Sequence, residues 1–285
     1  MNRGGVSTDR AQRIRTAPEP PAGTLLLANL RRTSALGFVL PVLATTLCLL
    51  LAFHTTEAAV QRVDVATLHG MVRARVAPLT WLALALNVVG STYVTVPVRA
   101  AVVVFLTARR RWWFLTTFVL ANVLEEVALH FLKSAYDRAR PPDPLVHTSG
   151  ASFPSGHAGV TAVIAVSLVI CLFRPGRSRR RWELAAIALT LVMGASRAYL
   201  AAHWLSDAVG GVLIGSSIAL GTAVVVQTVH DWLRRRAERG FEPPSRVEEA
   251  VEVAAEEEPG PLEASAVDHD GRAADQPADR PGPGG

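Results

Sequence analysis

The sequence predicts an all-α membrane protein, a polytopic bundle of six transmembrane helices with its N- and C-termini in the cytoplasm. Half of the 285 residues are hydrophobic although 19% are charged, so the charged residues must be separated from long apolar runs. Arginines gather in short clusters beside those runs. This distribution is typical of the cytoplasmic ends of membrane spans.

The apolar runs place the six crossings along the chain. A run of about 20 apolar residues is long enough to span the hydrocarbon core of a bilayer. We therefore expect spans at about 34–53, 91–108, 113–133, 157–173, 183–200 and 205–227. Residues 54–78 mix apolar and charged positions, which favours an amphipathic helix on the membrane surface. Residues 1–33 are polar and Arg-bearing, and are expected to form a disordered cytoplasmic N-terminus.

Residues 79–108 allow two interpretations. They form either two short spans that break near Gly90-Ser91, or an interfacial segment at 79–90 followed by one span. Four basic clusters decide between these, because cytoplasmic loops are rich in Lys and Arg. The clusters are at 31–32, 109–111, 174–181 and 234–236. All four clusters lie on the cytoplasmic face only if residues 79–108 cross the membrane once. We therefore predict a six-span domain at 34–236.

The chain beyond residue 236 differs in composition. Residues 237–285 contain 13 Asp or Glu and 4 Arg, a local charge of −9 in a chain of net charge +5. This acidic segment, rich in Pro and Gly, buries too little apolar surface to offset its ordering entropy, so we expect a disordered cytoplasmic tail. The basic excess elsewhere has no basic aromatic face, so no nucleic-acid partner is expected. No cofactor motif is found.

Three short motifs carry the polar chemistry. They are Lys133-Ser-Ala-Tyr-Asp-Arg-Ala-Arg140-Pro141, Pro154-Ser155-Gly156-His157, and Ser196-Arg197 followed by His203 and Asp207. The six-span topology places all three at the extracytoplasmic face. We therefore expect them to form one site.

The first and third motifs supply fixed positive charge. Lys133 is the only lysine beside 28 arginines, and a compact ammonium at the outer end of a span indicates a local need for a point charge. The planar guanidinium groups of Arg140 and Arg197 suit phosphoryl oxygens. Three such cations can stabilise a phosphoryl transition state without a metal ion, and we predict no metal.

The second motif opens the fourth predicted span. Ser155 is expected to cap this helix, whose first backbone N–H groups form an anion site. Gly156 lets the backbone approach a phosphoryl oxygen closely. His157 then acts as general acid toward the leaving oxygen and later as base for water. The alternative is a plain capped turn.

His203 and Asp207 begin the last predicted span. Four residues apart on a helix, they share a face, so the carboxylate can hold one imidazole nitrogen while the other attacks phosphorus. The alternative is a helix cap or a packed polar pair. Arg197 and the other two motifs favour the catalytic interpretation.

In this order the motifs resemble those of the type 2 phosphatidic acid phosphatase family, which also includes vanadium haloperoxidases and bacterial acid phosphatases. The resemblance covers roughly residues 34–227, and Lys-x6-Arg-Pro, Pro-Ser-Gly-His and Ser-Arg-x5-His-x3-Asp all match. It implies a metal-free helical bundle and a phosphohistidine intermediate, with His203 as nucleophile, Asp207 as its orienting group and His157 serving the leaving group. The phosphoryl-binding residues implied are Lys133, Arg140, Ser155, Gly156 and Arg197.

The function predicted is that of an integral phosphatase of the cell membrane, which hydrolyses a lipid phosphate or diphosphate at the extracytoplasmic face. Undecaprenyl diphosphate, phosphatidic acid and phosphatidylglycerol phosphate are the candidate substrates. Two alternatives stay open. One is a lipid-linked phosphotransferase with the same intermediate, and the other is a non-catalytic membrane protein that binds lipid phosphate.

Further polar residues lie within the predicted spans. Arg99 in the second span is expected to pair with Glu125 or Glu126 in the third, because an unpaired charge at that depth costs at least about 2.5 kcal/mol. The alternative is a role in substrate binding or proton transfer. Glu126, His130 and Lys133 are spaced by four and three residues, so they share one helix face that leads toward the site.

Overall fold

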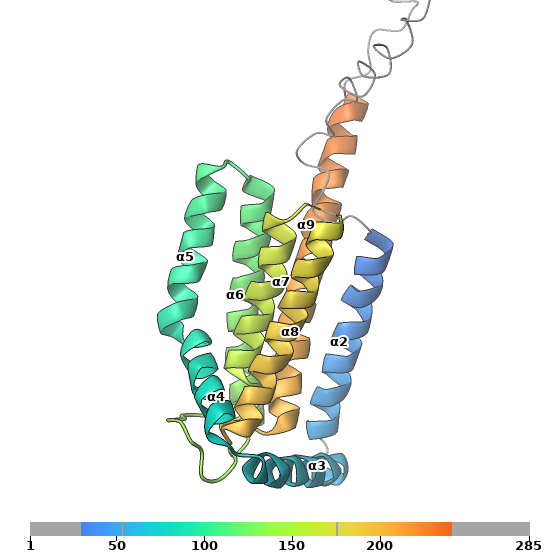
Figure 1. Cartoon of the computed structure of the whole chain (residues 1–285). Coiled ribbons are helices and arrows are strands. Elements are labelled where there is room, and N and C mark those ends of the chain that lie inside the picture. The colour runs from blue at the N-terminus through green and yellow to red at the C-terminus, as the bar shows by residue number, and fades with distance from the viewer. Residues whose placement is uncertain (1–29, 53, 175, 241–285) are drawn as a thin grey trace, which may run out of the picture. The chain divides into compact units, whose positions relative to one another are not determined.

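The computed structural model describes residues 30–52, 54–174 and 176–240. Within them all regular secondary structure is helical, as the sequence predicts, and the residues up to Arg235 form one compact unit. The helices are α2 (Leu30–Ala52), α3 (His54–Arg73), α4 (Ala77–Val89), α5 (Thr92–Ala108), α6 (Trp112–Tyr136), α7 (Gly156–Leu172), α8 (Arg177–Tyr199) and α9 (Leu205–Gly240) (Figure 1). Most of the predicted terminal segments 1–33 and 237–285 lies outside the described residues.

Two of the described helices are long and apolar enough to cross a membrane by themselves, α6 and the part of α9 at Leu205–Ala237. The number rises to four if the bent pairs α2 with α3 and α4 with α5 each count as one span. α7 is apolar but has only 17 residues, and α8 begins in an arginine cluster that lowers its hydropathy. Length and composition therefore qualify two to four spans in the described part of the chain, fewer than the six predicted.

The region that allowed two interpretations, residues 79–108, lies in a bent pair of helices. α4 ends at Val89, α5 begins at Thr92, and the two axes differ by 50°. Gly90 at the break leaves room for His157, because a Cβ atom on this glycine would lie 2.7 Å from the imidazole Cδ2. The break therefore brings the end of α4 against the first turn of α7.

α3 lies across one end of the bundle, bent by 102° from α2 (Figure 1). It is the helix predicted at 54–78 from the mixture of apolar and charged positions. Leu68 on its apolar side packs against Ala201 and Trp204 of the α8–α9 junction. The surface helix is therefore anchored to the segment that carries the third motif.

α7 is packed between other helices. It contacts α6 and α8, and two glycines let the backbone of α9 approach it closely. A Cβ atom on Gly211 would lie 2.4 Å from the carbonyl oxygen of Ser155, and one on Gly215 would lie 2.4 Å from that of Gly159. Only glycine fits at these positions, and this contact fixes α9 against the start of α7.

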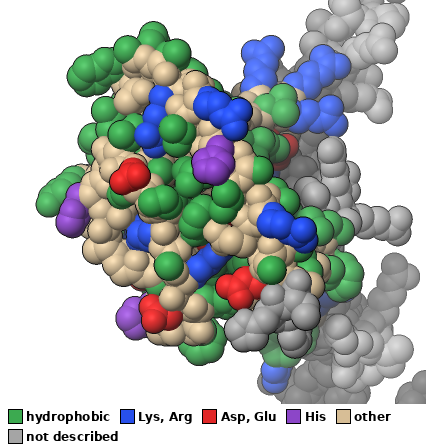
Figure 2. Space-filling model, turned by 90° about the horizontal axis from the view of Figure 1, so that it is seen from below, with side chains coloured by type: hydrophobic (Ala, Val, Ile, Leu, Met, Phe, Trp, Pro, Cys, Tyr) green, Lys and Arg blue, Asp and Glu red, His purple; other side chains and the backbone are tan. Residues whose placement is uncertain are grey.

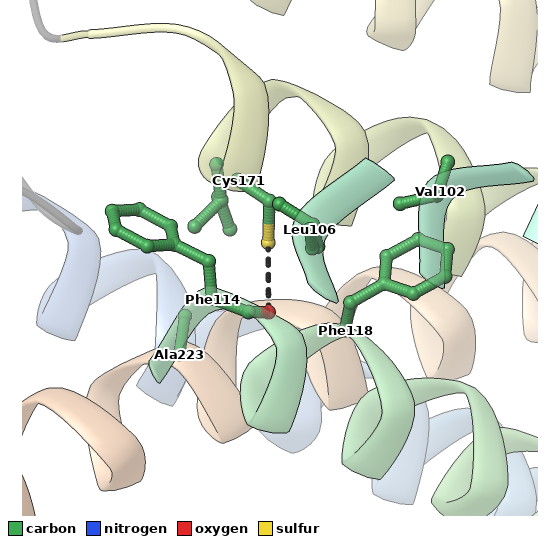
Figure 3. Packing of buried hydrophobic residues seen from close by; sticks show 7 residues of the cluster. Val102, Leu106, Phe114, Phe118, Cys171 and Ala223 are labelled. Atoms are coloured by element: carbon green, nitrogen blue, oxygen red, sulfur yellow. Dashed lines mark hydrogen bonds between the residues drawn. The ribbon is translucent and has the colours of Figure 1, made fainter. Parts of the chain in front are cut away.

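A hydrophobic cluster joins the helices near the α5–α6 turn. Val102 and Leu106 of α5 pack with Phe114 and Phe118 of α6 and with Cys171 of α7 (Figure 3). The Cys171 Sγ lies 3.5 Å from the carbonyl oxygen of Phe114, to which it donates a hydrogen bond. Contacts of this kind between helices are stabilised by close packing. This cluster holds the bundle together at the end opposite the three motifs.

The charge pair predicted between the second and third spans is present. Arg99 of α5 lies 3.6 Å from a carboxylate oxygen of Glu125 and 3.8 Å from one of Glu126, both on α6. Glu125 is fully buried, and neither of its carboxylate oxygens has a hydrogen-bond partner among the described residues. The pair is therefore an ion pair without a direct hydrogen bond.

Candidate active site

The three motifs meet at the end of the bundle that α3 and α4 border. The first lies at the end of α6 and in the loop that follows, the second at the start of α7, and the third at the α8–α9 junction. Hydrogen-bond contacts join them, since Arg140 lies against His203, and the Ser155 amide donates to the carbonyl oxygen of Asp207. Figure 2 shows this end of the molecule, where basic, acidic and histidine side chains lie among hydrophobic ones.

His203 is held between two groups of opposite hydrogen-bonding character. Its Nδ1 lies 2.7 Å from the carbonyl oxygen of Ser152, and its Nε2 lies 3.2 Å from Nη1 of Arg140. A carbonyl only accepts and a guanidinium only donates, so Nδ1 carries the proton and Nε2 presents its lone pair. Burial lowers the pKa of His203, and the positive charge of Arg140 acts in the same direction. The neutral imidazole, with its Nε2 lone pair directed at Arg140, is therefore the favoured form.

Asp207 acts on His203 less directly than the helical spacing predicts. His203 precedes α9, and its Nδ1 lies 3.8 Å from the Asp207 carboxylate, which is beyond hydrogen-bond length. The carboxylate instead accepts hydrogen bonds from the Ser152 hydroxyl and from the Trp204 amide at 2.9 Å. The Asp207 carboxylate therefore lies within ion-pair distance of Nδ1, and the carbonyl oxygen of Ser152 is the nearer acceptor for the Nδ1 proton.

Arg138, which the sequence analysis did not single out, links Asp207 to α3. Its Nη1 donates to Asp207 at 2.6 Å, and its Nη2 donates to Asp64 at 2.8 Å and to Gln61 at 2.7 Å. Asp64 is 2% exposed and also accepts from the amide and hydroxyl of Ser206. The signal for this network was available, since Asp64 lies on the apolar stripe of an amphipathic helix, where a lone carboxylate needs a buried partner.

Arg197 and His157 are joined by Asn87 of α4. The Arg197 Nη1 donates to the Asn87 side-chain oxygen at 2.8 Å, while His157 Nε2 lies 3.2 Å from the Asn87 carbonyl oxygen. The latter distance is at the long end for a hydrogen bond, so another acceptor can compete for this N–H. Sequence patterns gave no sign of Asn87, because its contacts depend on the bend at the end of α4.

Lys133 and Arg140 hold the loop between α6 and α7. Lys133 Nζ donates to the carbonyl oxygen of Ala151 at 2.9 Å. Arg140 donates to the carbonyl oxygens of Ser149 at 2.7 Å and Gly150 at 2.9 Å, and to that of Ala202 at 2.7 Å. Two of the predicted phosphoryl-binding cations thus lie beside the imidazole of His203 and bind backbone oxygens in this structure.

Ser155 stands at the N-cap position of α7, but its side chain makes no capping hydrogen bond, so that prediction is wrong. Its hydroxyl is buried and, like Nη2 of Arg197, has no hydrogen-bond partner within the described part of the chain. Leaving a buried polar group unsatisfied costs about 1–3 kcal/mol. α7 begins at Gly156, whose amide has no partner within its own helix. These donors match the needs of an oxyanion.

The chain is similar to proteins of known activity. A family model described as the PAP2 superfamily matches residues 110–231. Phosphatidylglycerophosphatase B of Bacillus subtilis is 30% identical over 174 residues, which cover 59% of this chain and 85% of that protein. Undecaprenyl-diphosphatase of Sulfolobus acidocaldarius is 30% identical over 162 residues, 54% of this chain and 74% of that one. Lipid A 1-phosphatase of Rhizobium etli is 32% identical over 124 residues, 40% and 49% of the two chains.

A solved structure is similar over most of the chain. The crystal structure of the first transmembrane PAP2 type phosphatidylglycerolphosphate phosphatase from Bacillus subtilis aligns with a TM-score of 0.58 and 25% identity. The alignment covers 68% of this chain and 96% of that one. The fold and the relatives define an all-helical membrane phosphatase, a phosphoric ester hydrolase. The chain belongs to the PAP2 superfamily.

Proposed function

We propose that this enzyme hydrolyses the phosphomonoester or diphosphate group of a membrane lipid through a phosphohistidine on His203. The observation that carries the proposal is the position of the His203 imidazole. Its Nδ1–H is fixed by the Ser152 carbonyl, and its Nε2 faces the cation Arg140. A buried neutral imidazole with one lone pair directed at a cationic pocket is suited to attack phosphorus.

In the first step, Nε2 of His203 attacks phosphorus and the bond from phosphorus to the leaving oxygen breaks. His157 donates a proton to that oxygen, which leaves as a lipid alcohol or a lipid monophosphate. In the second step, His157 removes a proton from water, the water oxygen attacks phosphorus, and the phosphorus–nitrogen bond breaks. Inorganic phosphate leaves, and the Nε2 lone pair is restored.

The surrounding residues stabilise the charges that develop. Lys133, Arg140 and Arg197, with the Ser155 hydroxyl and the Gly156 amide, bind the equatorial phosphoryl oxygens. Arg140 exchanges its contact with Nε2 for a phosphoryl oxygen, because the lone pair is needed for the attack. Asp207 stabilises the positive imidazole that forms when Nε2 is phosphorylated, from a distance of 3.8 Å.

We also propose a six-span topology for residues 34–236, with cytoplasmic termini and an extracytoplasmic active site in the cell membrane. The support is the placement of charge, because the basic clusters at 109–111 and 174–181 lie at the turns opposite the motif end of the bundle (Figure 1). Phosphatidic acid, phosphatidylglycerol phosphate and undecaprenyl diphosphate remain the substrates to compare. No metal ion is needed in this mechanism.

The test is phosphate release by purified protein in mixed micelles with chelator present. We expect His203→Ala to lower kcat by a factor on the order of 1000 or more, since the nucleophile is lost. His147→Ala is the control, because His147 is an exposed histidine of the α6–α7 loop. Quenching of the unmodified enzyme and labelled substrate in alkaline detergent should trap a phosphoenzyme that is stable to base and hydrolysed by acid. If His203→Ala turns over the lipid at the parental rate, the mechanism is contradicted. If the labelled phosphate appears in a new lipid and not as free phosphate, the enzyme is a phosphotransferase.

A further inference from the structure

Asn87 joins the end of α4 to Arg197, one of the proposed phosphoryl-binding cations. Apart from Trp81, α4 has only two side chains that can form hydrogen bonds, Thr80 and Asn87. Thr80 Oγ1 lies 2.9 Å from the hydroxyl of Tyr199. Arg197 Nη1 donates to the side-chain oxygen of Asn87 at 2.8 Å. Both polar side chains of an otherwise apolar helix therefore contact the last turn of α8.

Arg197 depends on Asn87 for its orientation. The arginine is buried, with 1% of its surface exposed. Its Nε donates to the hydroxyl of the preceding residue, Ser196, at 3.3 Å, and its Nη2 has no hydrogen-bond partner among the described residues. Within the described part of the chain, the bond to Asn87 is therefore the only side-chain hydrogen bond that ties this guanidinium group to another helix.

The partner that Asn87 provides is neutral. Buried charges are usually paired with an opposite charge, because their desolvation is costly. Arg138, another arginine at the site, pairs in this way with Asp64 and Asp207. Arg197 forms no ion pair with a carboxylate of the described residues. An amide oxygen satisfies one N–H group and leaves the positive charge uncancelled, so this charge is available to an anion.

We infer that Asn87 is a positioning residue, a neutral acceptor that holds the guanidinium group of Arg197 in place and preserves its charge for the phosphoryl group. This inference rests on the proposed function, in which Arg197 binds a phosphoryl oxygen. Asn87 then affects the reaction through Arg197 and does not bind the substrate itself. Loss of the acceptor and its replacement by a carboxylate should both weaken the binding of the phosphoryl group, for different reasons.

The experiment compares Asn87→Ala and Asn87→Asp with the unmodified protein in mixed micelles, with the most rapidly hydrolysed of the three candidate lipids as substrate. Alanine leaves Nη1 without its acceptor, so kcat/KM should fall by about tenfold to a hundredfold, the effect of a hydrogen bond to a charged group. Aspartate keeps the hydrogen bond and adds a negative charge beside the guanidinium group. The unfolding temperature should then stay near the parental value, while kcat/KM still falls by about tenfold or more, because the carboxylate repels the phosphoryl group.

Inorganic vanadate provides a readout that does not depend on turnover. It is an anion that can adopt the five-coordinate geometry of a phosphoryl group in transfer, and a ligand that binds the folded protein raises its unfolding temperature. Both variants should bind vanadate more weakly, by about the factor by which kcat/KM falls. At the same vanadate concentration, the unfolding temperature should therefore rise less in either variant than in the unmodified protein.

The matched control is Thr80→Ala, which removes another hydrogen bond between α4 and α8 and leaves Arg197 untouched. It should keep kcat/KM and the affinity for vanadate near their parental values. The inference is overturned if Asn87→Ala keeps the parental kcat/KM, if Thr80→Ala lowers kcat/KM as much as Asn87→Ala does, or if Asn87→Asp matches the parent in both kcat/KM and vanadate binding. Asn87→Asp retains the acceptor, so it decides even if Asn87→Ala fails to fold. If the unmodified protein releases phosphate from none of the three lipids, the proposed function is contradicted instead.

Discussion

The nucleophilic imidazole is positioned by main-chain and side-chain groups that lie far apart in the sequence. Ser152 serves twice, because its carbonyl accepts from His203 Nδ1 while its hydroxyl donates to Asp207. The carboxylate therefore holds the loop that holds the imidazole. Such an arrangement fixes the tautomer of His203 without placing a negative charge in direct contact with it.

The burial of His203 has a consequence for the pH dependence of activity. Its pKa is lowered in the folded protein, chiefly by desolvation, from an ordinary value of about 6.5. Activity should be lost only as the pH falls through this lowered pKa, where Nε2 becomes protonated. We therefore expect the acid limb of the kcat/KM profile to have its midpoint below pH 6.5. A midpoint at or above that value contradicts the neutral, buried imidazole.

The same group affects stability in a defined direction. Between the lowered and the ordinary pKa, the unfolded chain binds a proton at this histidine and the folded chain does not. The free energy of unfolding attributable to His203 should thus decrease as the pH falls below about 6.5. His203→Gln removes this contribution, and thermal unfolding in detergent at pH 7.5 and 5.5 measures the difference between the two proteins.

Some site residues were predictable from the sequence and others were not. Lys133, Arg140 and His203 stand out by residue type and spacing, and they lie together in the structure. Ser152 and Asn87 do not stand out, because they act through contacts that exist only after the loop and the α4–α5 bend have formed. A sequence pattern therefore indicates the chemistry of a side chain better than it indicates which residues will contact that side chain in the folded protein.

At the scale of elements, α3 is part of the active-site framework and more than a surface helix. Its Asp64 shares Arg138 with Asp207. Asp64→Asn removes one charge of this buried network and should destabilise the protein by about 1–3 kcal/mol. It should also lower kcat, because Arg138 then holds Asp207 less firmly. Thermal unfolding and phosphate release measure the two effects.

The matched control for this helix is Arg62→Gln, since Arg62 is exposed on α3. It should leave the unfolding temperature and kcat near the parental values. If Asp64→Asn and Arg62→Gln have the same unfolding temperature and the same kcat, a positioning role for Asp64 is contradicted.

The contact between α7 and α9 gives a second prediction for an element. A methyl group on Gly215 meets the carbonyl oxygen of Gly159, whereas one on Gly221, on the same helix, meets nothing within 4 Å. Gly215→Ala should therefore destabilise the protein by about 1–3 kcal/mol through overpacking. Gly221→Ala should be neutral or stabilising, because alanine favours a helix. Unfolding of both variants in the same detergent gives the comparison.

The elements themselves were largely predictable. The spans expected at 91–108, 113–133 and 183–200 correspond to α5, α6 and α8, because long apolar runs with basic ends specify them. The docking of α3 was not predicted. Its charged positions indicated a surface helix, and the place of Asp64 on the apolar stripe was the one local sign that this carboxylate is buried, here against Arg138.

At the scale of the whole molecule, the proposed orientation in the membrane can be tested with single cysteines. In a background where Cys48 and Cys171 are replaced, His147→Cys lies in the α6–α7 loop and Arg109→Cys at the α5–α6 turn. Both positions are exposed. A membrane-impermeant thiol reagent added to intact cells should label only the cysteine at 147. In permeabilised cells both cysteines should be labelled, which is the control. If only the cysteine at 109 is labelled in intact cells, the topology is the reverse of the one proposed.

Lys133 and Arg140 are tied to three successive backbone oxygens, those of residues 149–151. On the proposed mechanism, an arriving phosphoryl group and this stretch of chain compete for the same two cations. The affinity for the lipid then depends on the difference between two free energies, that of binding the phosphoryl group and that of binding these backbone oxygens. Residues 149–151 must release the two cations when the lipid binds. Substitutions in residues 149–151 that weaken these hydrogen bonds should therefore change the affinity for the lipid, and with it the rate of turnover, while the two imidazoles keep their positions.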